Sequence, residues 1–554
     1  MARLARREPG TDPMRGRLRL VAVGFAVAYL VIVVRLMMFG LMEPTGAGAY
    51  LDPNAAIASS RPDLVDRNGL ILATDIKTAS LYAEPRNVID PDEAAELIAS
   101  VLTDLDTRDL RERLAGNAGF IWIKREITAA EERGIHSLGI PGIGFLTESQ
   151  RFYPGGPTAS HLVGMVNVDN QGIAGFEKYV DDRWLGDLHA VGFARGEDLE
   201  PVRLSIDLRV QHILRDELAG AMELYSAIGA AGIVLDVHTG EALAIASLPD
   251  FDPNDPADAL KPDRLNRVTA GVYELGSVFK SFTFATALDS GAVGMGDMID
   301  ASQSIRVGRY SIDDFHGKHR VLTVPEVFIY SSNVGAARMA LETGADLQQE
   351  YLRRFGFYDR IDADLPELAR PLVPDKWSEV TAMTVAFGHG LAVTPLHVAV
   401  ADAALVNGGK LIPPTFEPRS RAEADRVATR VIAPLTSDQL RYLFRLNVLE
   451  GSGRNAAVPG YMVGGKTGTA EKVENGQYSS TKRLNSFLAA FPMDDPQYVV
   501  LVVLDEPQAP AGGGGTTAAS NAAPTVAAVI RRSAALLGVE PRAEEGIAAL
   551  LVTN

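Results

Sequence analysis

The chain has 554 residues, too many for one ordinary hydrophobic core, so we expect two or three domains. Its 47% hydrophobic and 22% charged residues fit a folded protein and exclude a disordered or fibrous one. A net charge of −17 argues against general nucleic-acid binding, because phosphates repel an acidic surface. The lack of cysteine excludes disulfides, thiolate metal sites and cysteine nucleophiles.

The N-terminal part has the pattern of a membrane anchor. Residues 1–19 form a basic arm with six arginines, and residues 20–42 are apolar except for Arg35. At roughly 1.5 Å per residue the apolar run spans about 34 Å, enough for the hydrocarbon core of a bilayer. Because basic flanks stay in the cytoplasm, we expect a single-pass transmembrane helix with a cytoplasmic N-terminus and the remaining chain outside. Residues 43–57 are typical of a linker.

Two other interpretations compete with the anchor. A cleaved signal peptide has a shorter apolar core and a small-residue exit site, whereas this run ends in Met37–Met42. A buried core helix is the plainer alternative, but the arginine-rich flank argues against it.

Residues 58–195 predict an α+β module without concentrated chemistry. The pair Asn68-Gly69, between two short apolar runs, predicts a hairpin over Leu64–Ala73. Two further elements are predicted here, a helix that starts at Asp90 and continues to about Leu105, and a strand over Phe120–Ile123.

From about residue 200 the pattern changes to that of a larger domain, which we place at 200–540 and which a tail at 541–554 follows. Its predicted strands are Gly232–Asp236, Glu241–Ala246, Asn485–Phe491 and Tyr498–Leu504, and its clearest predicted helices are Ser277–Leu288 and Pro524–Leu537. Strands at both ends with a mostly helical middle predict one sheet built from segments far apart in sequence. The glycine-rich residues 509–520 predict a mobile loop.

Three short motifs follow one another in this domain: Ser277-Val278-Phe279-Lys280 (S-x-x-K), Ser331-Ser332-Asn333 (S-x-N) and Lys466-Thr467-Gly468-Thr469 (K-T-G-T). Three helical residues turn the chain by about 300°, so Ser277 and Lys280 share a face. A serine hydroxyl is a weak nucleophile until a neighbour takes its proton, which Lys280 can do only when neutral. Burial and a second cation such as Lys466 would lower the pKa of Lys280. A helix N-terminus at Ser277 would favour developing negative charge there.

Each motif alone also has an ordinary structural interpretation. S-x-x-K occurs again at Ser479–Lys482, in a stretch that predicts a turn. The S-x-N residues suit a helix N-cap or a turn, and Lys466–Gly468 suits a polar loop. The functional interpretation depends on all three motifs occurring in order within one domain.

Two rival sites involve the same or nearby residues. Gly460–Thr467 matches the phosphate-binding pattern G-x-x-x-x-G-K-T, which requires a buried strand before it and a helix after it, and the sequence predicts neither. His316 and His319, with Asp313 and Asp314, have crude metal-ligand spacing, but we interpret them as a solvated loop and predict no metal site.

Together the three motifs resemble those of the penicillin-recognising serine enzymes, and with the anchor and the 58–195 module the chain resembles a class B penicillin-binding protein. Residues that resemble the three pedestal motifs are Arg61–Gly69, Glu148 with Arg151–Pro154, and Gly172–Glu177. Residues that resemble other catalytic-domain segments are Asn266–Arg267, Tyr273–Ser277, Ala386–Gly390, Val393–Leu396 and Asn407–Gly409. The chain departs from the usual pattern at Leu275, where proline is common, at Pro62, where glycine is common, and at Gly451-Ser452-Gly453, which replaces a common G-T-G. The chain is most similar to the division-specific septal transpeptidases, in an alphaproteobacterial style, and next to their elongation-specific paralogues.

The resemblance implies a fold and a reaction. The fold is an N-terminal transmembrane helix, an α+β pedestal of the class B dimerisation type, and a serine β-lactamase-like transpeptidase domain whose central antiparallel sheet is flanked by helices. The reaction is acyl transfer from the D-Ala-D-Ala end of a peptidoglycan stem peptide. Its implied residues are Ser277 as nucleophile, Lys280 as base, Ser331 as proton relay, Asn333, Lys466, Thr467 and Gly468 in substrate binding, and the N–H groups of Ser277 and Thr469 as oxyanion hole.

The resemblance also implies partners and a location. No metal or organic cofactor is needed, and β-lactams would acylate Ser277. A membrane glycan polymerase and other division proteins would contact the anchor and the pedestal. The protein would lie in the inner membrane at the division septum, with its catalytic domain in the periplasm. Two alternatives remain open: a D,D-carboxypeptidase or penicillin-hydrolysing relative that uses water as acceptor, and a membrane-anchored divisome scaffold with idle catalytic residues.

Overall fold

The computed structural model describes residues 29–30, 32–33, 61–185, 199–308, 310–474 and 477–542. The chain divides into two units, residues 1–57 and 58–554. The predicted basic arm and linker lie outside the described residues, as does the predicted membrane span except for four helical residues, Tyr29, Leu30, Ile32 and Val33. Within the described ranges, no helix combines the length and the apolar character that crossing a membrane requires.

A five-stranded sheet organises the N-terminal part of the second unit. Its strands are β1 (Leu64–Val65), β2 (Ile71–Ala83), β3 (Ile121–Ile127), β4 (Ile143–Phe152) and β7 (Val202–Arg203), and β2 pairs with β1, β3 and β4. The predicted hairpin is confirmed, because Leu64 pairs antiparallel with Ala73. Gly69 has φ +85° at this turn, a conformation that glycine adopts without steric cost.

Helices pack on this sheet and close a small core of their own. They are α2 (Pro91–Val101), α3 (Thr107–Leu114) and α4 (Ala129–Leu138). Asp90 caps α2 as predicted, because its carboxylate accepts hydrogen bonds from the amides of Asp92 and Glu93. The predicted helix end at Leu105 is wrong: α2 ends at Val101, since Leu102 leaves helical geometry and a new cap at Asp106 begins α3.

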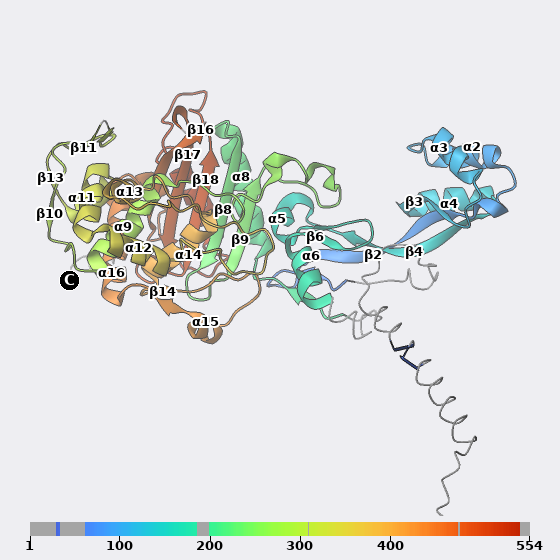
Figure 1. Ribbon diagram of the computed structural model, residues 1–554, viewed down its shortest axis with the longest axis horizontal. Helices are drawn as coiled ribbons and strands as arrows, with labels where there is room; N and C mark the ends of the chain where they lie inside the picture. Colours follow the sequence, from blue (N-terminus) through green and yellow to red (C-terminus); the bar gives the residue numbers. More distant parts are fainter. Residues whose placement is uncertain are drawn as a thin grey trace, which may run out of the picture. The chain divides into compact units, whose positions relative to one another are not determined.

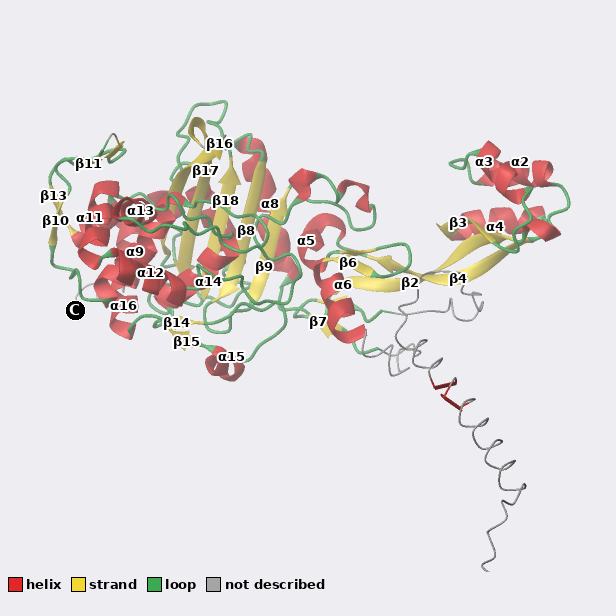
Figure 2. Cartoon of the chain, in the orientation of Figure 1, coloured by secondary structure: helices red, strands yellow, loops and turns green. Residues whose placement is uncertain are grey.

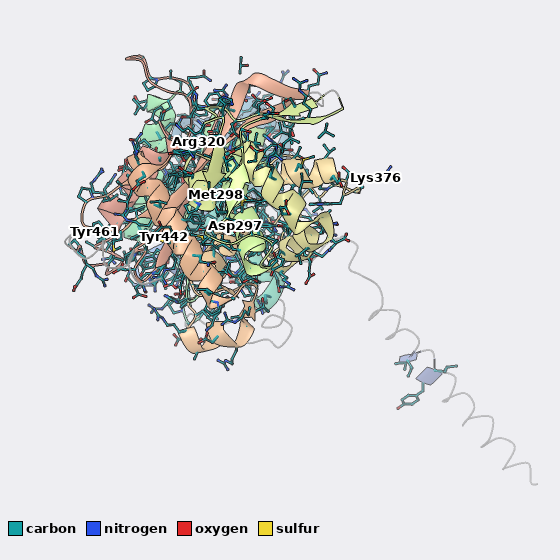
Figure 3. All side chains as sticks on the ribbon, turned by 90° about the vertical axis from the view of Figure 1, so that its left-hand side faces the viewer. Asp297, Met298, Arg320, Lys376, Tyr442 and Tyr461 are labelled. Carbon is teal, nitrogen blue, oxygen red and sulfur yellow. The ribbon has the colours of Figure 1, made fainter. Side chains whose placement is uncertain are left out.

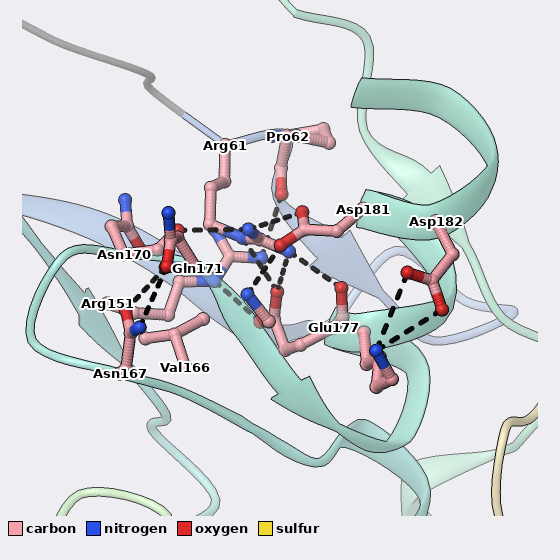
Figure 4. Close-up of polar contacts among 12 residues, drawn as sticks. Arg61, Pro62, Arg151, Val166, Asn167, Asn170, Gln171, Glu177, Asp181 and Asp182 are labelled. Carbon is pink, nitrogen blue, oxygen red and sulfur yellow. Dashed lines mark hydrogen bonds and ion pairs between the residues drawn. The ribbon is translucent and has the colours of Figure 1, made fainter. Parts of the chain in front are cut away.

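A buried ion cluster joins four segments of the chain next to β5 (Met165–Val166), β6 (Gly172–Ala174), α5 (Ser160–Val163) and α6 (Gly175–Val180) (Figure 4). Arg61 contacts Glu177 at 2.8 Å and Asp181 at 2.6 Å. Arg151 contacts Glu177 at 2.7 Å and Asp75 at 3.0 Å, with its side chain 0% exposed. The three segments that resemble pedestal motifs all take part, through Arg61, Arg151 and Glu177. Arg151 also donates to the carbonyl of Pro62 at 2.8 Å.

Replacing Arg151 with methionine should destabilise the protein strongly. The change leaves Glu177 and Asp75 buried with one guanidinium fewer, and breaking such a buried pair costs about 3–5 kcal/mol. Urea unfolding of the full chain measures the loss. Lys178→Met is the matched control: its pair with Asp182 is exposed, so we expect a change of about 1 kcal/mol or less. Equal effects of the two substitutions would contradict the structural role of the cluster.

The second sheet has the strand order β16-β17-β18-β8-β9 and is antiparallel throughout (Figure 1). Its strands are β8 (Gly229–Asp236), β9 (Ala242–Leu248), β16 (Gly464–Glu474), β17 (Gln477–Phe491) and β18 (Tyr498–Asp505). The prediction of one sheet assembled from distant segments is thereby confirmed.

Helices cover both faces of this sheet (Figure 2). Helices α8 (Leu208–Leu224) and α17 (Ala522–Ser533) pack on one face, while α14 (Pro395–Val406) and α16 (Pro434–Glu450) pack on the other. Alternate residues of β18 therefore enter different cores: Val499, Leu501 and Val503 enter one, and Val500, Val502 and Leu504 enter the other. Burial on both faces explains why β18 reads as a continuous apolar run.

The other elements lie mostly between β9 and β16 in sequence. The helices are α9 (Lys280–Asp289), α10 (Val324–Ile329), α11 (Asn333–Thr343), α12 (Ala345–Arg354), α13 (Glu379–Val385) and α15 (Arg421–Val427). The short strand pairs are β10 (Met298–Asp300) with β13 (Val321–Thr323), β11 (Ile305–Val307) with β12 (Tyr310–Ile312), and β14 (Lys410–Leu411) with β15 (Thr429–Arg430). These helices carry the first two motifs to the edge of the sheet.

Candidate active site

The S-x-x-K residues lie where a 3₁₀ turn, η6 (Gly276–Phe279), runs into α9. We expected an α-helix starting at Ser277, and the tighter turn aligns the pair better. A 3₁₀ turn has about three residues per turn, so side chains at i and i+3 lie directly above one another. The Lys280 Nζ atom is 3.1 Å from the Ser277 Oγ atom.

The S-x-N residues connect α10 to α11. Ser332 is the N-cap of α11, as the structural interpretation predicted, and its hydroxyl accepts from the amide of Gly335. Its two neighbours instead contact Lys280, whose Nζ lies 3.1 Å from Ser331 Oγ and 2.7 Å from Asn333 Oδ1. Ser331 has φ +55°, a left-handed conformation that costs about 1–2 kcal/mol in a non-glycine residue. Strain of this kind is typical of functional sites.

The K-T-G-T residues lie in β16, the edge strand of the sheet. Lys466 Nζ is 2.9 Å from Ser331 Oγ, so both lysines contact the same hydroxyl. Thr467 Oγ1 is 2.8 Å from the hydroxyl of Ser452. All three motifs, which lie between Ser277 and Thr469 in the chain, therefore meet at one point, as the sequence predicted.

The contacts around Lys280 fit a neutral amine that can act as a base. The carbonyl oxygen of Ser331, at 2.5 Å, and Asn333 Oδ1 can only accept hydrogen bonds. They take the two hydrogens of a neutral amine and leave its lone pair for the hydroxyl of Ser277. The hydroxyl of Ser331 is then free to accept from Lys466.

Burial explains why this amine can lose its proton near neutral pH. Lys280 is 0% exposed, and burial lowers its pKa to about 7, although the charge of Asp314 raises it. Lys466 is also 0% exposed, and burial together with the charge of Lys280 lowers its pKa well below the usual value. We expected burial and the charge of Lys466 together to lower the pKa of Lys280. Burial does lower it, whereas the repulsion between the two lysines lowers the pKa of Lys466.

Acylation by a penicillin should therefore increase as pH rises through about 7. The base is active when deprotonated, so the rate falls about tenfold per pH unit below the pKa of Lys280 and reaches a plateau above it. Stopped-flow labelling with a fluorescent penicillin between pH 5 and 10 measures the profile. A midpoint near the value for free lysine, about 10.4, would contradict the burial argument.

Two glycines allow β16 to contact the turn that carries Ser277. A Cβ atom on Gly468 would lie 2.3 Å from the carbonyl oxygen of Leu275, and one on Gly276 would lie 2.6 Å from that of Thr469. The carbonyl of Thr469 thus faces η6, and in an extended strand the N–H of a residue points the same way as its carbonyl. We predicted that Gly468 lets the strand approach a substrate; in the structure it lets the strand approach the turn that carries Ser277.

The structure does not support the alternative phosphate-binding site. Lys466 and Thr467 lie within an antiparallel strand that continues to Glu474, so no helix follows the G-x-x-x-x-G-K-T pattern and the phosphate-binding alternative is wrong. The turn predicted at Ser479–Lys482 is also wrong, because these residues belong to β17, although the register of its pairing with β16 shifts beside them. Across the described ranges from 61 to 542, no group of three or more potential metal ligands occurs.

Sequence reasoning missed the residues that support the site. Asn447 on α16 donates to the carbonyl of Gly465 at 2.7 Å and accepts from Ser452, which contacts Thr467. The only feature of the sequence that pointed to Asn447 was its nearness to Ser452, which lies in a segment that resembles a family motif, Gly451-Ser452-Gly453. Asp314 was considered only as a metal ligand, yet it binds the hydroxyl of Ser332 at 2.6 Å.

Comparisons with known proteins agree with this fold. Residues 230–530 match the family model described as "Penicillin binding protein transpeptidase domain", and residues 56–186 match "Penicillin-binding Protein dimerisation domain". The chain therefore belongs to the class B penicillin-binding proteins, which are peptidoglycan D,D-transpeptidases.

Three similar proteins illustrate the relationship. The chain is 37% identical to the probable peptidoglycan D,D-transpeptidase FtsI of Caulobacter vibrioides, over 90% of this chain and 85% of that protein. It is 30% identical to FtsI of Escherichia coli, over 82% of this chain and 80% of that protein. The crystal structure of penicillin-binding protein 3 from Mycobacterium tuberculosis, complexed with aztreonam, superposes with a TM-score of 0.66 at 25% identity, over 87% and 97% of the two chains.

Proposed function

We propose that this transpeptidase crosslinks peptidoglycan stem peptides through an acyl ester on Ser277. The observation that supports this most directly is the 3.1 Å contact between the hydroxyl of Ser277 and the buried amine of Lys280. Two oxygen acceptors and the hydroxyl of Ser331 also contact this amine. Ser277 Oγ attacks the carbonyl between the two D-alanines while Lys280 takes its proton. The new ester bond forms on Ser277, and the amide bond to the terminal D-alanine breaks.

Ser331 relays the proton. Its hydroxyl lies between the two amines, 3.1 Å from Lys280 Nζ and 2.9 Å from Lys466 Nζ. A proton on Lys280 can pass through this hydroxyl to the nitrogen of the leaving D-alanine. An amine of a neighbouring stem peptide then attacks the ester, loses its proton along the same route and releases Ser277 with a new peptide crosslink.

The edge strand holds the donor peptide. Lys466 and Thr467 bind its terminal carboxylate, and Asn333 binds an amide of its backbone. The N–H groups of Ser277 and Thr469 stabilise the oxyanion, where one donor contributes about 3 kcal/mol. A β-lactam acylates Ser277 in the same way, and the chemistry uses no metal or organic cofactor.

Product analysis tests this function. The full chain in detergent is incubated with a donor stem pentapeptide and an acceptor peptide. We expect crosslinked dimer with one free D-alanine per crosslink, and neither product from Ser277→Ala. Trimmed monomer without dimer would instead identify a D,D-carboxypeptidase. Absence of both products, together with no labelling by a fluorescent penicillin, would identify a scaffold.

We further propose that the protein acts at the division septum, anchored in the inner membrane with its catalytic domain in the periplasm. The similarity to proteins named FtsI and the basic arm followed by an apolar run support this proposal. The peptidoglycan polymerase of the membrane and other division proteins are its proposed partners, through residues 1–42 and the pedestal. Imaging a tagged full chain should show midcell bands, whereas sidewall patches would indicate the elongation-specific paralogue.

A further inference from the structure

Asp314 follows the strand β12 in sequence and contacts the S-x-N turn, Ser331–Asn333. It lies outside all three motifs. Its carboxylate accepts from the Ser332 hydroxyl at 2.6 Å and from the amide of Val334 at 2.9 Å. Both donors belong to the first residues of α11, so one side chain fixes the start of this helix. The preceding residue adds a third contact, because the carbonyl oxygen of Asp313 accepts from Asn333 Nδ2 at 3.1 Å.

These contacts determine how the S-x-N turn faces the base. Asn333 can present its carbonyl oxygen to Lys280 only if its NH₂ group points away, and the carbonyl of Asp313 holds it there. Ser331, immediately before the residue bound by Asp314, is held in a left-handed conformation. That conformation is costly, so it needs surrounding contacts to maintain it.

We propose that Asp314 is a positioning residue for acylation: its carboxylate holds the Ser331–Asn333 turn against the amine of Lys280 and supplies a negative charge beside that amine. The proposal rests on the roles given above to Ser277 and Lys280. A positioning residue acts through another group: the carboxylate of Asp314 contacts Ser332 and Val334, whereas the hydroxyl of Ser277 contacts Lys280.

The negative charge of Asp314 matters because it opposes the other influences on the pKa of Lys280. Lys466 on β16 and His389, which follows α13, are the other titratable groups facing it, and the charge of Lys280 lowers the pKa of both. Burial lowers the pKa of Lys280 to about 7, and Asp314 supplies the opposing effect. The balance leaves a substantial neutral fraction of the amine at pH 7 and keeps it basic enough to take a hydroxyl proton.

The test compares Asp314→Asn with the starting protein by the pH profile of acylation, using the full chain and a fluorescent penicillin. Asparagine keeps the size and one acceptor of the side chain but removes the charge. We expect the midpoint of the profile to move to lower pH, because the charged form of Lys280 loses its neighbour. We also expect the plateau rate to fall about tenfold or more, because a misplacement of about 1 Å near the chemistry can cost about 10²-fold.

Asp300→Asn is the matched control. The carboxylate of Asp300 likewise accepts from a serine hydroxyl and a backbone amide, those of Ser302 at 2.5 and 2.9 Å, but on an exposed strand end. We expect its profile and rate to match those of the starting protein. The midpoint does not depend on the fraction of folded enzyme, so a poorly folding variant still gives an answer.

The outcomes separate this proposal from the proposed function. An unchanged midpoint in Asp314→Asn, or a plateau rate within twofold of the starting protein, would overturn the positioning role. Labelling of the starting protein that disappears in Ser277→Ala keeps the proposed function intact in either case. Labelling that survives in Ser277→Ala would instead refute the proposed function itself.

Discussion

Lys280→Met should slow acylation by a penicillin about 10³-fold, since general bases contribute about 10²–10⁴-fold. Methionine fills a similar buried volume without an amine, so Ser277 keeps its place but no nearby group accepts its proton. The loss should persist at every pH from 6 to 9, because no titrating base remains. Rates of fluorescent labelling of the full chain measure the effect, and thermal melting checks that the variant folds.

Lys376→Met is the control for this substitution, because Lys376 lies on the exposed surface (Figure 3). We expect its labelling rate to equal that of the starting protein. If Lys280→Met retained more than a tenth of the rate, another group would be the base and the proton route through Lys280 would be wrong.

Gly468→Ala should lower the acylation rate about 10²-fold. The added Cβ would lie 2.3 Å from the carbonyl oxygen of Leu275 and 2.8 Å from a methyl of Val278. Because the first of these is backbone, β16 must move away from η6, and a shift of about 1 Å at the reacting atoms costs about 10²-fold. The same fluorescent penicillin measures the rate.

Gly220→Ala controls for the loss of a glycine. A Cβ at position 220 meets nothing within 4 Å, and alanine is the better helix former in α8. We expect an unchanged rate and equal or higher stability. A normal rate in Gly468→Ala would show that the close contact between the strand and the nucleophile's turn is not needed.

The pairing of Ser277 with Lys280 could be predicted because it depends only on residues that are close together in the sequence. Ser277 and Lys280 are three positions apart, so either kind of helical turn aligns them, and the prediction did not depend on which one forms. The β18 strand was likewise predictable, since burial on both faces leaves an uninterrupted apolar run. The C-terminal end of α2 was less predictable, because Leu102 leaves the helix without a glycine or proline to mark it.

The supporting contacts could not be predicted because they depend on tertiary packing. Nothing near Gly468 in the sequence indicates that the carbonyl of Leu275 will lie against it. Asp314 looks like any loop aspartate until α11 is placed beside it, and spacing alone suggested a metal ligand. Asn447 reaches β16 only because α16 packs on that strand.

The central claim is that Ser277 is the residue that becomes acylated. The most direct test exposes the full chain to benzylpenicillin, digests it and locates the adduct by mass spectrometry. We predict one adduct per chain, on the peptide that contains Ser277, and none in Ser277→Ala. An adduct on a different residue, or one that persists in Ser277→Ala, would contradict the account.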